Sequence, residues 1–120
     1  MLATVLLINS VSLPAGQEMV PPLKDGNYIF EHKYEEAEQH TIKSIKLNVK
    51  ITGNHIVVIN NDRFDVFPKG ILEEGTLMWH SQSQQWIIGT TPSDKDAQEV
   101  GGCTGGPTVV DLEKRIYWTC

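Results

Sequence analysis

The alternation of hydrophobic and polar residues is clearest over residues 44–51. Ile45, Leu47, Val49 and Ile51 are apolar, and the residues between them are polar. A period of two predicts a β-strand with one buried face and one face toward water. The strand ends at Thr52-Gly53-Asn54, where glycine and asparagine supply the positive φ of a tight turn.

Residues 55–59 are almost wholly apolar and β-branched, and they predict the second strand of this hairpin. Short strand-like runs separated by turn residues continue to the end of the chain. The further predicted strands are residues 27–33, 64–67, 71–73, 76–80, 85–88, 108–112 and 115–119.

Three connections carry specific predictions. Glu74-Gly75 is expected to turn the chain between strands 71–73 and 76–80. Ser93 is expected to cap one helical turn within the polar stretch 91–99. The acidic stretch 34–40 predicts either a short helix or an exposed loop.

This order of elements predicts an all-β fold. Sequential hairpins favour an antiparallel meander, because parallel strands need long crossover connections that the chain does not offer. We expect about eight strands closed into a barrel, which removes exposed sheet edges, with a two-sheet β-sandwich as the alternative. Residues 25–120 would form this single domain, after an extended linker over residues 16–24.

Residues 1–15 are uncharged, with an apolar run over residues 1–8 followed by Ser12-Leu13-Pro14-Ala15. They predict an export signal with a small residue at its cleavage site, although the usual basic residues are missing. The alternative is a true first strand, whose apolar surface would support a homodimer. The run is too short to span a bilayer.

The chain contains two cysteines, Cys103 and the last residue, Cys120. Neither has a second cysteine or a histidine at metal-ligand spacing, so we expect a disulfide between them. The glycine-rich segment 101–106 would let the two backbones approach closely. A disulfide predicts an oxidising location, periplasmic or secreted.

The 120 residues carry a net charge of −5 with no local cluster of lysine and arginine, which argues against binding to nucleic acids. We find no motif for a cofactor, metal or catalytic group. His80 and Ser81 are adjacent on a predicted strand and therefore point to opposite faces, as do Glu73 and Glu74. An enzyme is consequently not predicted, although a hydrolase with a site built across strands stays open.

Aromatic residues are the main candidates for a binding site. Trp79 and Trp86 lie on two strands of one predicted hairpin, and Tyr28 and Trp118 lie on other strands. Large aromatic side chains most often belong to the core. The alternative is that Trp79 and Trp86 line a ligand cavity or recognition patch, if the turn register places them on one face.

Gly26-Asn27-Tyr28 opens the first strand of the domain, and Arg115 lies on the predicted last strand. This arrangement resembles the calycins, the lipocalin- and avidin-like barrels. They open with Gly-x-Trp and set a basic residue of the last strand against that tryptophan. Tyr28 stands here in place of the tryptophan. The resemblance implies a closed antiparallel barrel, with either a ligand cavity or an interior filled by its own side chains. It identifies no ligand residues to carry over, and Tyr28 and Arg115 stand beside Trp79 and Trp86 as candidate ligand residues.

Two functions follow as expectations. The first is an exported, non-enzymatic β-barrel that binds a small apolar ligand inside or a partner on its surface. The second is a periplasmic inhibitor or immunity protein that blocks a toxin or hydrolase, since an acidic domain is steered toward basic targets.

Overall fold

The computed structural model describes residues 19–36, 45–62 and 67–120. The predicted export signal or first strand at 1–15, most of the predicted strand 64–67 and most of the stretch 34–40 lie outside these residues. Seven strands form a closed barrel in chain order. They are β1 Gly26–Tyr34, β2 Lys46–Thr52, β3 His55–Asn60, β4 Gly70–His80, β5 Gln85–Gly89, β6 Thr108–Asp111 and β7 Ile116–Thr119.

The predicted barrel is confirmed, with two corrections. Consecutive strands pair antiparallel, but β1 and β7 close the barrel as a parallel pair. This follows from the number of strands, because the first and last strands of an odd-numbered meander run in the same direction. The barrel is therefore mixed rather than purely antiparallel, and the described part of the chain contains seven strands rather than about eight.

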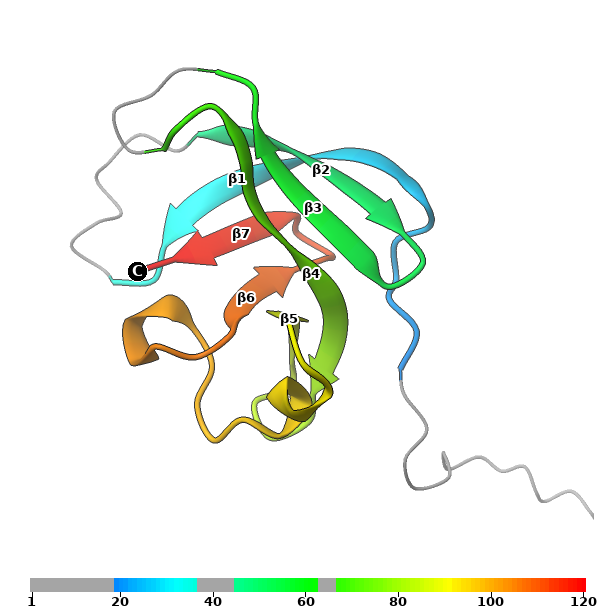
Figure 1. Cartoon of the computed structure of the whole chain (residues 1–120), viewed down its shortest axis with the longest axis vertical. Coiled ribbons are helices and arrows are strands. Elements are labelled where there is room, and N and C mark those ends of the chain that lie inside the picture. The colour runs from blue at the N-terminus through cyan, green and yellow to red at the C-terminus, as the bar shows by residue number, and fades with distance from the viewer. Residues whose placement is uncertain (1–18, 37–44, 63–66) are drawn as a thin grey trace, which may run out of the picture.

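The prediction of a hairpin at Glu74-Gly75 was wrong, since both predicted strands belong to β4. Its first part pairs with β3 and its last part with β5, so β4 runs as one long curved strand across the barrel (Figure 1). Gly75 does not form a turn; its missing side chain lets the backbones of β4 and β5 approach closely. A Cβ atom at this position would lie 2.6 Å from the carbonyl oxygen of Gly89.

The barrel interior is filled by the chain's own side chains. Alternate residues of the strands point inward and form one hydrophobic cluster. As predicted, Leu47, Val49 and Ile51 of β2 are buried while Lys46 and Lys50 are exposed. Ten side chains of this cluster are at most 2% exposed: Phe30, Leu47, Val49, Ile51, Ile56, Val58, Leu77, Ile88, Val110 and Leu112.

The segment between β5 and β6 covers part of the outer wall. It contains two short 3-10 helices, η3 Pro92–Asp96 and η4 Gly102–Thr104. The outward-pointing Ile87 is fully buried although it lies opposite the core face. Nε2 of His80 bonds to the carbonyl oxygen of Ala97 at 2.6 Å, which fixes the segment to β4.

The predicted helical turn is present, but Ser93 does not cap it. The helix η3 begins at Pro92, which has no N–H to leave unpaired at a helix start. The carboxylate of Asp94 instead accepts hydrogen bonds from the backbone N–H groups of Thr90 (2.7 Å) and Thr91 (3.2 Å). These bonds hold the pKa of Asp94 below its usual range.

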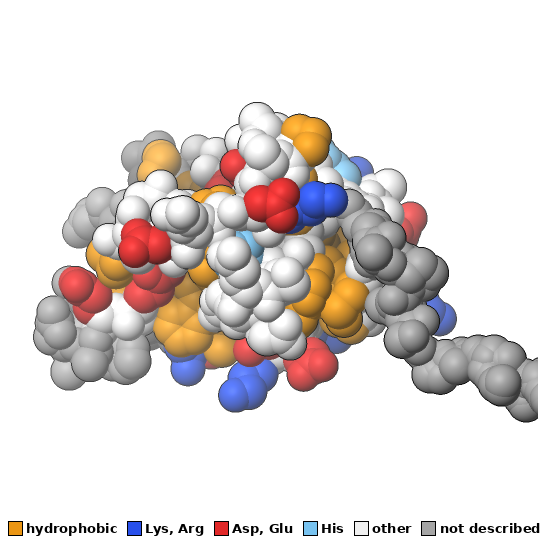
Figure 2. All heavy atoms as spheres, turned by 90° about the horizontal axis from the view of Figure 1, so that it is seen from below, with side chains coloured by type: hydrophobic (Ala, Val, Ile, Leu, Met, Phe, Trp, Pro, Cys, Tyr) orange, Lys and Arg blue, Asp and Glu red, His pale blue; other side chains and the backbone are white. Residues whose placement is uncertain are grey.

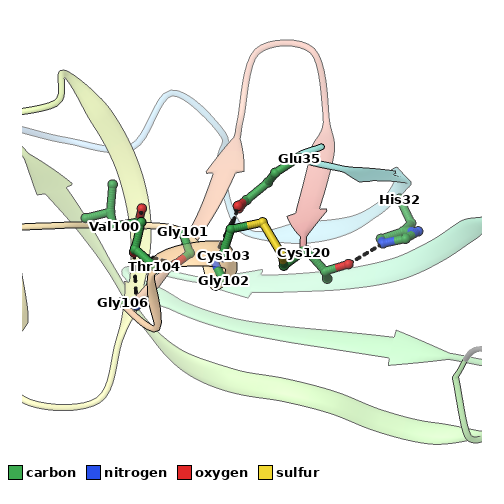
Figure 3. Close-up of a disulfide and its surroundings, with 10 residues drawn as sticks. His32, Glu35, Val100, Gly101, Gly102, Cys103, Thr104, Gly106 and Cys120 are labelled. Carbon is green, nitrogen blue, oxygen red and sulfur yellow. Dashed lines mark hydrogen bonds between the residues drawn. A yellow bond between two sulfur atoms is a disulfide. The ribbon is translucent and has the colours of Figure 1, made fainter. Parts of the chain in front are cut away.

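The predicted disulfide joins Cys103 of η4 to Cys120, directly after β7 (Figure 3). The carboxylate of Glu35 reaches the same place and accepts hydrogen bonds from the N–H groups of Gly102 and Cys103, each at 3.2 Å. A Cβ atom on Gly102 would lie 3.3 Å from the nitrogen of Cys120, so glycine lets these segments meet.

No helix in the described residues is long and apolar enough to cross a bilayer.

Gly75→Ala should lower the free energy of unfolding by about 1–3 kcal/mol, because its methyl group would collide with the Gly89 backbone. Urea unfolding followed by tryptophan fluorescence measures the loss. Gly53→Asn is the matched control, since Gly53 has a φ of 61° with open space around it, and asparagine tolerates this conformation. Equal stability of Gly75→Ala and the wild type would contradict the close approach.

Replacing both Cys103 and Cys120 by serine should destabilise the protein by roughly 3 kcal/mol, because the 17-residue separation is no longer constrained in the unfolded chain. Urea unfolding midpoints measure the effect. Wild-type protein treated with a reductant should match the double variant. An unchanged midpoint in both samples would refute a stabilising disulfide.

Candidate functional site

The strands of a meander reverse direction at alternate ends, so three short turns share one end of the barrel. We call it the hairpin end, made of residues 53–54, 81–84 and 112–115. The β1–β2, β3–β4 and β5–β6 connections leave the strands at the other end, and the β5–β6 segment then folds back along the outer wall, where Ala97 reaches His80. The candidate site lies at the hairpin end, between the turns 81–84 and 112–115.

Side chains at the ends of β4 and β6 shape these two turns. Nδ1 of His80 accepts a hydrogen bond from the N–H of Ser83 at 3.2 Å. Oδ1 of Asp111 accepts hydrogen bonds from the N–H groups of Glu113 (3.0 Å) and Lys114 (2.8 Å). Both turns end in a left-handed residue, Gln84 with a φ of 58° and Arg115 with a φ of 61°.

Trp79 and Trp86 lie opposite each other across the β4–β5 pair. Their rings meet edge to face, with centroids 5.4 Å apart and planes at 67°. Trp86 is 8% exposed and belongs to the core cluster, against which the half-buried Trp79 packs. The register therefore brings the two tryptophans together on one face, which the sequence left open.

These indoles form one wall of a pocket of about 240 Å³. The lining is aromatic, aliphatic, amide and acidic. It consists of Trp79, Gln84, Gln85, Trp86, Val109, Val110, Asp111, Leu112, Glu113 and Trp118. Figure 2 looks onto the side of the molecule that is lowest in Figure 1 and shows hydrophobic side chains open to solvent among acidic, basic and uncharged groups.

The structure adds side chains that the sequence did not single out as ligand residues, chiefly Trp118, Asp111 and Glu113. A signal for Trp118 was available, because it is a third tryptophan on a predicted strand. Asp111 and Glu113 carried no such signal, since acidic residues are common in turns.

Tyr28 and Arg115 form a second pair, apart from the lining of this pocket. The guanidinium carbon of Arg115 lies 4.9 Å from the centre of the Tyr28 ring, a cation–π contact. The hydroxyl of Tyr28 donates to the carbonyl oxygen of Lys24 at 2.5 Å. The sequence had suggested that Arg115 lies on the last strand, but it belongs to the turn before β7. The four predicted ligand residues thus divide into two separate pairs.

Two hydrogen bonds join polar side chains inside the described part of the barrel. Nε2 of His32 is hydrogen-bonded to Oγ1 of Thr119 at 2.7 Å, and the hydroxyl of Tyr117 donates to the carboxylate of Glu73 at 2.8 Å. Burial lowers the pKa of the His32 imidazole. Burial, and then the charge of the Glu73 carboxylate, raises the pKa of Tyr117. These bonds satisfy polar groups that would otherwise be costly in an apolar interior.

Among the described residues one histidine–carboxylate pair lies within hydrogen-bond distance, since Nε2 of His55 is 2.7 Å from Oε2 of Glu74. Both side chains are about half exposed, at 48% and 49%, on the outer face of β3 and β4. Glu73 and Glu74 point to opposite faces, as predicted, one toward Tyr117 and the other toward His55. An exposed pair on a convex wall gives a hydrolase no enclosed site for its substrate.

One group of possible metal ligands occurs in the described residues, formed by Glu36, Cys103 and Cys120 within 4.8 Å. Both sulfur atoms are bonded to each other and are therefore not thiolates. Because zinc and similar ions bind the thiolate form, the oxidised chain does not offer this group as a metal site.

The fold and the site define a small β-barrel with a filled interior, one disulfide and an aromatic pocket at its hairpin end. Comparisons of the chain with protein-family models, with curated proteins and with solved structures find no match. The resemblance to the calycins stays a prediction, and the functional proposal rests on the geometry of the chain itself.

The stability of the wild type should fall as the pH drops below about 6.5, because an unfolded histidine binds a proton that the buried His32 resists. The His32 contribution is complete above this pH and is lost as the pH falls through the lowered native pKa. His32→Phe should make the free energy of unfolding less dependent on pH between 7.5 and 5, as measured by urea unfolding. Thr119→Val retains the imidazole and should keep the wild-type dependence. If the free energy of unfolding of His32→Phe depended on pH as steeply as that of the wild type, the pH dependence could not be assigned to His32.

Proposed function

We propose that this protein is an exported, non-enzymatic binding module that recognises a partner protein at the pocket of its hairpin end. The observation that carries the proposal is the contrast between the interior and this pocket. The interior is filled by side chains that are almost fully buried, whereas Trp79 and Trp118 are partly open at the surface. An apolar ligand inside the barrel would need these core side chains to move apart, at a cost in packing.

The composition of the pocket supports a protein partner. Tryptophan is enriched among the residues that dominate the energy of protein interfaces, usually within a rim of polar groups. Here the three indoles adjoin the amides of Gln84 and Gln85. The Cys103–Cys120 disulfide supports export, because such bonds persist in oxidising compartments.

A protein that inhibits a hydrolase or toxin is one form of this function. The solid core and the net charge of −5 favour it, since negative charge speeds association with basic targets. The segment 91–99 does not support insertion of a loop into an active site, because η3 packs on β4 and β5 and Ala97 is bonded to His80. The hairpin-end pocket is then the surface that makes the contact.

The proposal predicts that full-length protein isolated from its own source carries a protein partner and no lipid in native mass spectrometry. Trp118→Ala should lower the amount of bound partner at least about tenfold, as loss of an interface anchor does. Ile71→Ala removes a 61%-exposed side chain of β4 that does not line the pocket, and it should bind as the wild type does. Circular dichroism confirms that both variants fold.

A bound lipid without any protein would overturn the proposal, and so would a partner that Trp118→Ala retains in full. Alkylation of the isolated chain tests export separately. Both cysteines should resist the reagent until a reductant is added, because they are joined to each other. Free thiols in protein from its own source would contradict an oxidising location.

A further inference from the structure

The hairpin-end pocket has a shape suited to one side chain. Its volume of about 240 Å³ lies below the range of roughly 300–1,000 Å³ that is typical of sites for drug-sized ligands. The planes of Trp79 and Trp86 meet at 67°, so the two indoles form a corner and not a single flat platform. A small planar group fits against one face of such a corner more readily than a whole sugar ring does.

The charges around the pocket favour a cation. Asp111 at the end of β6 and Glu113 in the turn 112–115 bring two carboxylates to its edge, whereas Lys114 and Arg115 of this turn do not line it. Gln84 and Gln85 add amide oxygens that accept hydrogen bonds. The pocket lining in the described part of the chain includes no lysine or arginine. The whole chain carries a net charge of −5, which also attracts cations and repels anions.

Tryptophan faces and carboxylates together match one protein side chain especially well. The arginine guanidinium is planar, stacks on aromatic faces and donates several hydrogen bonds in one plane to carboxylates. Lysine offers a compact and strongly hydrated charge without this planar surface. The Arg115–Tyr28 contact at 4.9 Å shows that the barrel already uses this type of interaction at its hairpin end.

We propose that the hairpin-end pocket receives an arginine side chain from the surface of a basic partner protein, with the guanidinium against the indoles and its N–H groups directed to Asp111 and Glu113. This inference rests on the proposed function and names the chemistry of the partner. The partner is then a positively charged protein that presents an arginine at the centre of its binding surface.

The test uses the full chain labelled with ¹⁵N and two peptides, acetyl-Gly-Arg-Gly-amide and its citrulline analogue. Citrulline has nearly the shape of arginine but no charge. The arginine peptide should shift the indole N–H signals of Trp79, Trp86 and Trp118 in a saturable way, and added salt should weaken this binding. The citrulline peptide should bind at least about tenfold more weakly, because it lacks the charge-assisted hydrogen bonds.

The double variant Asp111→Asn and Glu113→Gln should weaken the arginine peptide about tenfold while keeping the acceptor oxygen that organises the turn. A matched control is the double variant Asp96→Asn and Glu99→Gln, which removes the same charge from exposed side chains outside the pocket. It should bind the peptide as the wild type does. If both double variants lost the same affinity for the arginine peptide, the loss would come from net charge alone, and the assignment of the site would be overturned.

Three other results would overturn the inference: equal binding of both peptides, signals that shift only outside the pocket, or shifts caused by methyl β-D-glucoside and not by arginine. The proposed function has its own readout in partner recovery. A partner lost in Trp118→Ala, together with no preference for arginine, would leave the proposed function standing and reject this inference. Arginine binding by a chain that carries no partner would reject the proposed function instead.

Discussion

Closure of the barrel through the parallel β1–β7 pair is the constraint on which the rest of the structure depends. The ladder contains four residue pairs, and β7 is itself four residues long. A strand this short gains little from its own backbone hydrogen bonds and depends on further attachment. Without β7 in place, the strands β1 and β6 would each expose an unpaired edge.

Several covalent and polar contacts converge on this closure. The Cys103–Cys120 bond holds the end of β7, and the N–H of Glu35 donates to the carbonyl oxygen of Thr119 at 2.8 Å. Thr119 is also hydrogen-bonded to His32 inside the barrel (Figure 3). The start of β7 is tied as well, because the carbonyl oxygen of Arg115 accepts a hydrogen bond from the N–H of Glu31 at 2.9 Å. The β5–β6 pairing, with Trp86 opposite Val110, places the turn 112–115 beside the tryptophans.

The filled interior explains why binding is assigned to the hairpin end of this barrel. A barrel of this size has room for its own inward side chains and little more. The described interior even accommodates the Tyr117–Glu73 hydrogen bond and the buried His32. Aromatic surface that does not fit inside, from Trp79 and Trp118, contributes to the pocket between two turns. These turns owe their shape to side chains at the strand ends, His80 and Asp111.

The sequence by itself determined the class of fold, the strands with alternating burial and the disulfide, because these depend on local periodicity and on the presence of two cysteines. Tertiary structure alone decided that Gly75 lies within a strand and that Trp79 faces Trp86. It also decided that the first and last of the seven strands close the barrel as a parallel pair. Glycine fits both a turn and a close backbone approach, and strand register depends on long-range pairing that no local pattern encodes. For the same reason Asp111 and Glu113 became candidate ligands only when the β5–β6 pairing placed them beside the indoles.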